Sequence, residues 1–496
     1  MRILFKNGNI YGEDFKLYKF MSVKDGVFEY VGNHEPIGIN FNKEVDLKGN
    51  FVFPGFFDSH IHLLSYSKTL FELNLSGIQS MEEVKKVLKS FKPKGGVVYG
   101  FGWDDEKWKV KPDKRILDEI FPDRFVILKR RDGHSLWVNS LVLKKFNIDK
   151  DTPDPQGGKI ERDEEGNPNG VLRDRAMELV KLQDSLYSEK EIINEGIKKL
   201  HSLGITSVCN MDGDILPVLI EGKFKLRIFS SIPLEKLDSL ISLGLRSFFG
   251  DEFLKIGGVK VFLDGSLGSK TCFMKEGFED EKKNRGLIYF DDGELEEIFK
   301  RIEDNNLVLW IHSIGDMANE IILSIFEKLW KKRNLHHRIE HAQILSESLI
   351  ERIRSIKPYL SIQPSHIYLD VEKIEKYLGK RGRWTYPIKS LMNSGSVVSF
   401  GSDAPIEDPE PLKGIKVSIE RKAGGKFFYP EEAITVKEAF RAYTINGAIS
   451  VGEETRLGSI KEGKAADFII FDADPLSLNA KVIATYINGI SVFEIL

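Results

Sequence analysis

In residues 186–454 short apolar runs alternate with amphipathic helical segments, a pattern that is compatible with few folds. Helical segments such as "DMANEIILSIFEKLWKKR" and "SESLIERIRSIK" separate several of the runs. Together with the run "PGFFDSHIHLL" near the start of the chain, this makes about eight repeats, the number in a TIM-like (β/α)8 barrel. A doubly wound open sheet uses the same alternation, but no Gly-x-Gly-x-x-Gly follows a strand to support it. The predicted barrel strands after the first lie at 204–211, 226–232, 256–266, 306–316, 337–344, 359–365 and 396–405.

Both ends of the chain read as short β-strands. Residues 1–52 contain alternating apolar and polar stretches broken by Asn-Gly and Asp-Gly turns, and residues 455–496 have the same character. We expect the two ends to pair into one composite β-sandwich. An independent N-terminal β-domain with an unrelated C-terminal tail is the competing arrangement.

A long segment interrupts the strand–helix alternation directly after the first predicted barrel strand. The first strand occupies residues 53–65, and residues 66–185 hold turn-rich stretches such as "DTPDPQGGKIERDEEGNPNG". We interpret 66–185 as an insertion subdomain. Barrel sites lie where strands end and βα loops begin, so we expect the insertion to sit over the site.

Metal-binding residue types recur at the ends of the predicted strands. His60 and His62 lie at i and i+2, so in a strand both imidazoles, and Asp58 before them, point the same way. Each residue also has an ordinary explanation: Lys260 could reach solvent, the later histidines could be buried in the core, and Asp403 could cap a turn. Their shared position at strand ends favours one divalent metal site instead. The candidates are His60, His62, Lys260, His312, His341 and Asp403.

Composition excludes several classes of function. A formal net charge of −3 gives no support for a nucleic-acid or membrane-surface role. No apolar run approaches the roughly 20 residues of a spanning helix, and the start lacks the apolar stretch of a signal peptide. Two cysteines, Cys209 and Cys272, fit a reducing cytoplasm, where we expect the protein to reside.

Six motifs in order resemble the amidohydrolase superfamily. They are "PGFFDSHIHL", "VKVFLDGSLGSKT", "IHSIGD", "RIEHAQ", "GSDAP" and "GSIKEGKAADFIIFD". More narrowly, they resemble its amidohydrolase-3 branch, which contains N-substituted formamide deformylase and proteins named exoenzyme regulatory protein. The likeness runs over nearly the whole chain and implies a barrel with a metal centre, joined to a β-sandwich made by both termini.

The resemblance assigns roles residue by residue. His60 and His62 would bind the more buried metal, and His312 and His341 the more exposed one. Asp403 would contact the buried metal and the attacking water. Lys260 matches the strand-four position where many members carry a carboxylated lysine that bridges two metals. Cys272 departs from the small residue expected there, and we interpret it as a buried filler.

The resemblance also implies the chemistry. We expect one or two divalent ions per chain, with zinc as the expected metal, and hydrolysis of an amide or formamide C–N bond by metal-activated hydroxide. Asp403 would act as general base and then general acid. Two alternatives stay open: a one-metal deaminase, which usually leaves the strand-four lysine unused, and a non-catalytic regulatory protein on the same fold.

Residues that would determine substrate specificity are harder to identify from the sequence. His134 in "RDGHSLW" is a candidate catalytic group delivered by the insertion. Gln363 and His366 follow a barrel strand and are expected near the pocket, whereas Arg338 and Glu340 are expected to support His341. The tryptophans Trp103, Trp108 and Trp137 are better explained as core. We expect a small amide-like substrate, no nucleic-acid or membrane partner, and we leave a homodimer open.

Overall fold

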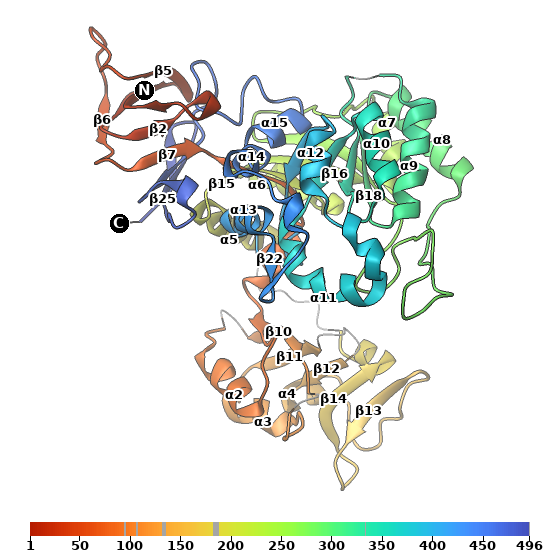
Figure 1. Cartoon of the computed structure of the whole chain (residues 1–496). Helices are drawn as coiled ribbons and strands as arrows, with labels where there is room; N and C mark the ends of the chain where they lie inside the picture. Colours follow the sequence, from red (N-terminus) through yellow and green to blue (C-terminus); the bar gives the residue numbers. More distant parts are fainter. Residues whose placement is uncertain (94–95, 106–107, 131–134, 182–187, 333, 496) are drawn as a thin grey trace. The chain divides into compact units, whose positions relative to one another are not determined.

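The computed structural model describes residues 1–93, 96–105, 108–130, 135–181, 188–332 and 334–495. It divides into two compact units, one made of Met1–Ser65 with Ile197–Leu496 and the other of Tyr66–Gly196. Figure 1 shows the larger unit with its barrel helices, and both chain termini in its β-rich part. Helices α1 (Leu63–Thr69) and α5 (Glu189–Ser202) span the two boundaries between the units.

The larger unit contains an eight-stranded parallel sheet in the order β21-β20-β19-β18-β17-β16-β15-β8. Hydrogen bonds from Asp403 N to His60 O (2.7 Å) and from His62 N to Ala404 O (3.0 Å) join the last strand to the first. Gly401 permits this approach, because a Cβ there would lie 2.5 Å from the backbone nitrogen of His60. The strands are β8 (Phe56–Ile61), β15 (Ile205–Asn210), β16 (Arg227–Pro233), β17 (Leu254–Phe262), β18 (Leu309–Ser313), β19 (Arg338–His341), β20 (Tyr359–Ile362) and β21 (Val398–Phe400).

Helices follow most of the barrel strands, and the longer ones bury one apolar face. In α10 the buried residues are Leu349, Ile350, Ile353 and Ile356, which is the spacing of one helical face. Ser346 caps this helix by accepting from Leu349 N. The helices are α6 (Leu216–Gly222), α7 (Leu237–Ser242), α8 (Asp292–Asp304), α9 (Asp316–Leu329), α10 (Glu347–Ile356), α11 (Ile367–Leu378), α12 (Ile388–Asn393), α13 (Pro411–Glu420), α14 (Val436–Ala442) and α15 (Ile445–Ser450).

These elements confirm the predicted TIM-like barrel. Each run predicted as a barrel strand overlaps one of the eight strands, although β16 ends one residue later and β17 begins two residues earlier than predicted. A small hairpin, β22 (Lys422–Ala423) and β23 (Lys426–Phe427), follows α13.

Two further sheets lie in the same unit and share a core. Strand β24 pairs antiparallel with β7, so the C-terminal strands continue a sheet begun by the N-terminal ones. Phe468 stacks on Tyr486 with ring centroids 4.5 Å apart, and Phe5 of the other sheet meets Phe468 edge-on at 5.1 Å. One sheet holds β1 (Arg2–Lys6), β4 (Phe20–Lys24), β5 (Val27–Gly32) and β6 (Lys43–Asp46). The other holds β2 (Asn9–Tyr11), β3 (Leu17–Tyr18), β7 (Phe51–Pro54), β24 (Phe468–Phe471), β25 (Val482–Ile487) and β26 (Ile490–Glu494).

The unit Tyr66–Gly196 has its own six-stranded sheet and its own core. Trp103, Trp108 and Trp137 lie in that core, at most 3% exposed, with ring centroids 6.2–6.4 Å apart. They are therefore packing residues. The elements are β9 (Leu73–Asn74), β10 (Val97–Trp103), β11 (Phe125–Arg130), β12 (Ser135–Val138), β13 (Gly158–Arg162) and β14 (Pro168–Asp174), with α2 (Met81–Ser90), α3 (Lys114–Ile120) and α4 (Ser140–Lys145).

Among the described residues, no helix combines the length and the apolar character needed to cross a bilayer.

Candidate metal centre

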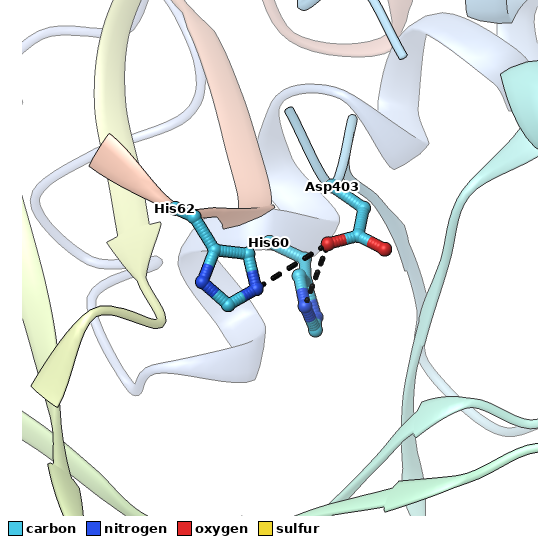
Figure 2. A group of neighbouring side chains, drawn as sticks. All are labelled: His60, His62 and Asp403. Atoms are coloured by element: carbon cyan, nitrogen blue, oxygen red, sulfur yellow. Dashed lines mark ion pairs between the residues drawn. The ribbon is translucent and has the colours of Figure 1, made fainter. Parts of the chain in front are cut away.

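His60 and His62 stand at the end of β8, and a nitrogen of each ring faces one carboxylate. His60 Nε2 and His62 Nε2 each lie 3.5 Å from Asp403 Oδ1, as Figure 2 shows. On the other side of each ring an acid holds Nδ1: His60 Nδ1 donates to Glu340 Oε2 at 2.7 Å, and His62 Nδ1 donates to Asp212 Oδ1 at 3.0 Å. These bonds favour the tautomer in which Nε2 keeps its lone pair. Both Nε2 atoms are therefore available to a metal ion.

His341 and His366 reach the same aspartate from neighbouring strands. His366, in the turn after β20, places Nε2 3.6 Å from Asp403 Oδ2. His341 donates from Nδ1 to Gln363 Oε1 at 2.8 Å. The backbone of His341 has φ +73° and that of Asp403 φ +56°, a left-handed conformation that non-glycine residues seldom adopt. Such backbone strain is frequent at functional sites.

His312 joins the cluster with a different hydrogen bond. Its ring centroid lies 4.5 Å from that of His341. Its Nε2 donates to the carbonyl of Gly265 at 3.2 Å and lies 3.7 Å from Asp264 Oδ1. The resemblance pairs His312 with His341. Among the described residues, however, the ligand atoms that gather with those of His341 come from His366 and Asp403.

Lys260 lies near the end of β17, 4% exposed, and lines the same cavity as the histidines. Within the described part of the chain its Nζ finds no hydrogen-bond partner. The ring centroid of Phe262 lies 4.8 Å from Nζ. Burial lowers the pKa of this amine to about 8, although Glu340 and Asp403 oppose the change. A buried amine without a partner is consistent with a group that reacts or binds.

Burial sets the charge state of the other side chains. It lowers the pKa of His60 and of His341 well below the usual range, and it lowers the pKa of His312 to about 3. These imidazoles are neutral at physiological pH, which is the form that binds metals. Burial also raises the pKa of Asp403. Its carboxyl group is therefore easier to protonate than one in water.

The donor set fits a divalent ion of the zinc type. Neutral imidazole nitrogens and a carboxylate oxygen are the ligands that zinc accepts, and each acceptor behind a histidine orients it. Within the ranges that the structure describes, Lys260 Nζ and His366 Nε2 are buried without a hydrogen-bond partner, which also fits a binding site for an ion. Two sets of ligand atoms each lie within 4.8 Å of one another, and both include Asp403: His60, His62 and Asp403, and His341, His366 and Asp403.

The cluster opens into a cavity of about 310 Å³ at the C-terminal ends of the barrel strands. Apolar residues form much of the wall beyond the histidines, including Leu267, Ile314, Leu369 and Ile406. A small organic molecule with one polar reacting group suits such a cavity.

Sequence reasoning missed two acids of the site. Asp212 holds His62, and its second oxygen accepts from Leu64 N at 2.8 Å. Asp264 accepts from Gly315 N at 2.8 Å and from Ile314 N at 3.0 Å, and burial raises its pKa to about 7. Asp212 directly follows the predicted strand 204–211, in "NMDGD", and Asp264 lies near the end of the predicted strand 256–266, in "FLDGS". The strand-end position used to select the histidines would have found them too.

The remaining candidates are placed as follows. His134 lies outside the described residues. Arg338 donates to Glu340 Oε1 at 2.6 Å, so both support His60 rather than His341. Cys272 is fully buried and does not line the cavity.

Comparisons with known proteins agree with this geometry. The family described as "Amidohydrolase family" (Amidohydro_3) matches residues 43–493. The amidohydrolase-named protein YtcJ of Bacillus subtilis is 32% identical over the full length of both chains. N-substituted formamide deformylase of Arthrobacter pascens is 26% identical over 91% of this chain and 90% of its own. A solved structure of an uncharacterized metal-dependent hydrolase from Pyrococcus horikoshii superposes with a TM-score of 0.79 at 29% identity, covering 96% of this chain and 98% of that one. The chain belongs to the amidohydrolase family.

Proposed function

We propose that the protein is a metal-dependent hydrolase that cleaves a non-peptide C–N bond, in an amide or formamide. The observation that carries the proposal is the convergence of two histidine pairs on the two oxygens of Asp403 in one cavity. A regulatory protein on this fold would not need four imidazoles gathered around one carboxylate, three of them buried. The formamide deformylase among the relatives supports the bond type.

The ion would be held by His60, His62 and Asp403, with a second one at His341 and His366, and we propose zinc. When bound, a divalent ion lowers the pKa of water and polarises a carbonyl oxygen. We further propose that Lys260 is carboxylated. Its neutral amine attacks carbon dioxide, a C–N bond forms, and the released proton passes to water. The carbamate then offers two anionic oxygens where an ammonium would repel the ions.

Asp403 performs the proton transfers. Its Oδ1 lies beside His60 and His62 and its Oδ2 beside His366, so the carboxylate borders both halves of the cluster. It accepts a proton from the attacking water and donates it to the leaving nitrogen. Burial raises the pKa of Asp403, which makes its carboxylate a stronger base toward the attacking water. The cavity wall combines apolar residues with the charged side chains of Asp370 and Lys373, which suits a small substrate with both apolar and polar groups.

The proposals for domain organisation, location and oligomeric state are those that the sequence predicts. We propose that residues 1–52 and 455–496 act as one β-sandwich, that residues 66–185 are an insertion subdomain, and that the protein works in the cytoplasm as a monomer or dimer.

Metal analysis combined with a hydrolysis screen tests the function. The purified protein is expected to contain zinc and to hydrolyse a member of a panel of N-formyl, N-acyl and cyclic amides. His62→Asn removes a ligand and should lose both metal and activity. His336→Asn is the matched control, because His336 stacks on Tyr359 away from the cluster. If metal-loaded protein cleaves no C–N bond in the panel, or if His62→Asn keeps its metal, the proposal is wrong.

A further inference from the structure

A second cavity adjoins the metal centre at the barrel mouth. It measures about 340 Å³, and it shares two wall residues, Lys260 and Phe262, with the first cavity. Its remaining walls come from the segments that follow β15, β16 and β17. Phe262 therefore forms the boundary between two spaces, each large enough for part of a small molecule.

The second cavity is apolar. Its walls include Met211, Pro233, Leu234, Val261, Tyr289 and Phe290, and Glu235 is the one carboxylate among the described residues that line it. Phe262 and Tyr289 are 47% and 51% exposed. Large exposed aromatic side chains beside a polar cluster are typical of a surface that binds an apolar ligand.

Phe262 is also in contact with the reacting centre. Its ring centroid lies 5.4 Å from that of His312 and 4.8 Å from Lys260 Nζ. A backbone hydrogen bond from Tyr289 N to Leu263 O, at 3.0 Å, ties the far wall to the end of the same strand. Phe262 thus borders the histidine cluster on one side and the second cavity on the other.

We propose that the second cavity binds an apolar, preferably aromatic, arm of the substrate, which makes the substrate class amides with such an arm. This inference rests on the proposed hydrolase function. The arm can be attached through the nitrogen or through the acyl carbon of the amide, since both arrangements present the same apolar chemistry to the cavity. Burying a phenyl group should raise kcat/KM on the order of 100-fold over a methyl group.

Two substrate series distinguish the two attachments. One series is N-methyl, N-butyl and N-benzyl formamide, and the other is acetamide, pentanamide and phenylacetamide. We expect kcat/KM to rise with the arm in one series. Leu234→Arg, which puts a charge in the second cavity, should remove this gain. Leu243→Arg is the matched control, because Leu243 is 71% exposed and lines neither cavity.

Binding supplies a readout that does not depend on turnover. N-benzylmethanesulfonamide, which resists hydrolysis, is titrated by ligand-observed NMR into wild type, Leu234→Arg, Leu234→Asn and Leu243→Arg. The inference predicts at least tenfold weaker binding to both Leu234 variants and no change for Leu243→Arg. Equal binding to all four proteins overturns it, as does a flat kcat/KM in both series. If no amide is hydrolysed but the binding pattern holds, the hydrolase proposal fails and the arm-binding cavity stands.

Discussion

Replacing Glu340 with glutamine should weaken metal binding at His60 and also lower the folding stability. Glu340 is completely buried and bridges two groups: Arg338 Nε donates to its Oε1 at 2.6 Å, and His60 Nδ1 donates to its Oε2 at 2.7 Å. Glutamine keeps the shape and one acceptor oxygen. Because the guanidinium of Arg338 can only donate, the amide oxygen should face Arg338, and the amide nitrogen then faces His60 Nδ1, a donor against a donor. His60 can relieve this only by moving its proton to Nε2, which removes the lone pair from the metal side.

The expected magnitudes follow from two separate losses. Removing one partner of a buried ion pair costs about 3–5 kcal/mol of folding stability, because Arg338 stays charged and buried. Losing the acceptor behind a metal-binding histidine weakens metal binding roughly 10- to 100-fold, or about 1.4–2.8 kcal/mol. Both effects should therefore be measurable in one variant.

A second buried pair provides the matched control. Arg227 Nε donates to Asp467 Oδ2 at 2.5 Å, and both side chains are buried away from the cluster. Asp467→Asn should lower the unfolding midpoint to a similar extent and leave metal affinity unchanged. Zinc affinity is measured by chelator competition and stability by urea unfolding of the metal-free proteins. If Glu340→Gln binds zinc like wild type, or if Asp467→Asn loses zinc equally, the role assigned to Glu340 is refuted.

Three further predictions address other parts of the molecule. Lys260→Ala should lose metal occupancy and hydrolysis, and acetate with bicarbonate should partly restore both. Lys260→Arg should not be rescued, because its guanidinium group stays charged. Full metal content in Lys260→Arg would exclude a bridging role. Burial lowers the pKa of His201 to about 4, below the unfolded value of 6.5. The unfolded state therefore binds more protons between these values, so the stability that neutral His201 contributes is lost as pH falls from about 6.5 to 4. His201→Gln should reduce the difference in the free energy of unfolding between pH 7 and pH 4.5 by up to about 3 kcal/mol, as measured by urea titration. An unchanged difference would contradict the assignment. Trp103→Ala should destabilise the unit Tyr66–Gly196 by about 3–5 kcal/mol, seen as faster proteolysis within it, and zinc content is expected to stay at the wild-type level.

The sequence by itself determined the barrel and the positions from which ligands come. Strand and helix periodicity is local, so eight runs and the polar residues that end them can be read without knowing how the strands pair. His60 and His62 share a strand face for the same reason. The family followed from ordered motifs, and the family match confirms it.

Only the tertiary structure decided which side chains meet. His60 and Glu340 are 280 positions apart, and only closure of the barrel brings them together. In a regular strand the side chains of His341 and Glu340 point to opposite faces. The left-handed backbone at His341 changes the direction of its side chain, which no periodicity predicts. The choice of His366 beside Asp403, with His312 turned to Gly265, depends on rotamers and loop paths. Long-range closure and single backbone torsions are set by packing of the whole barrel, and therefore lie beyond what local sequence encodes.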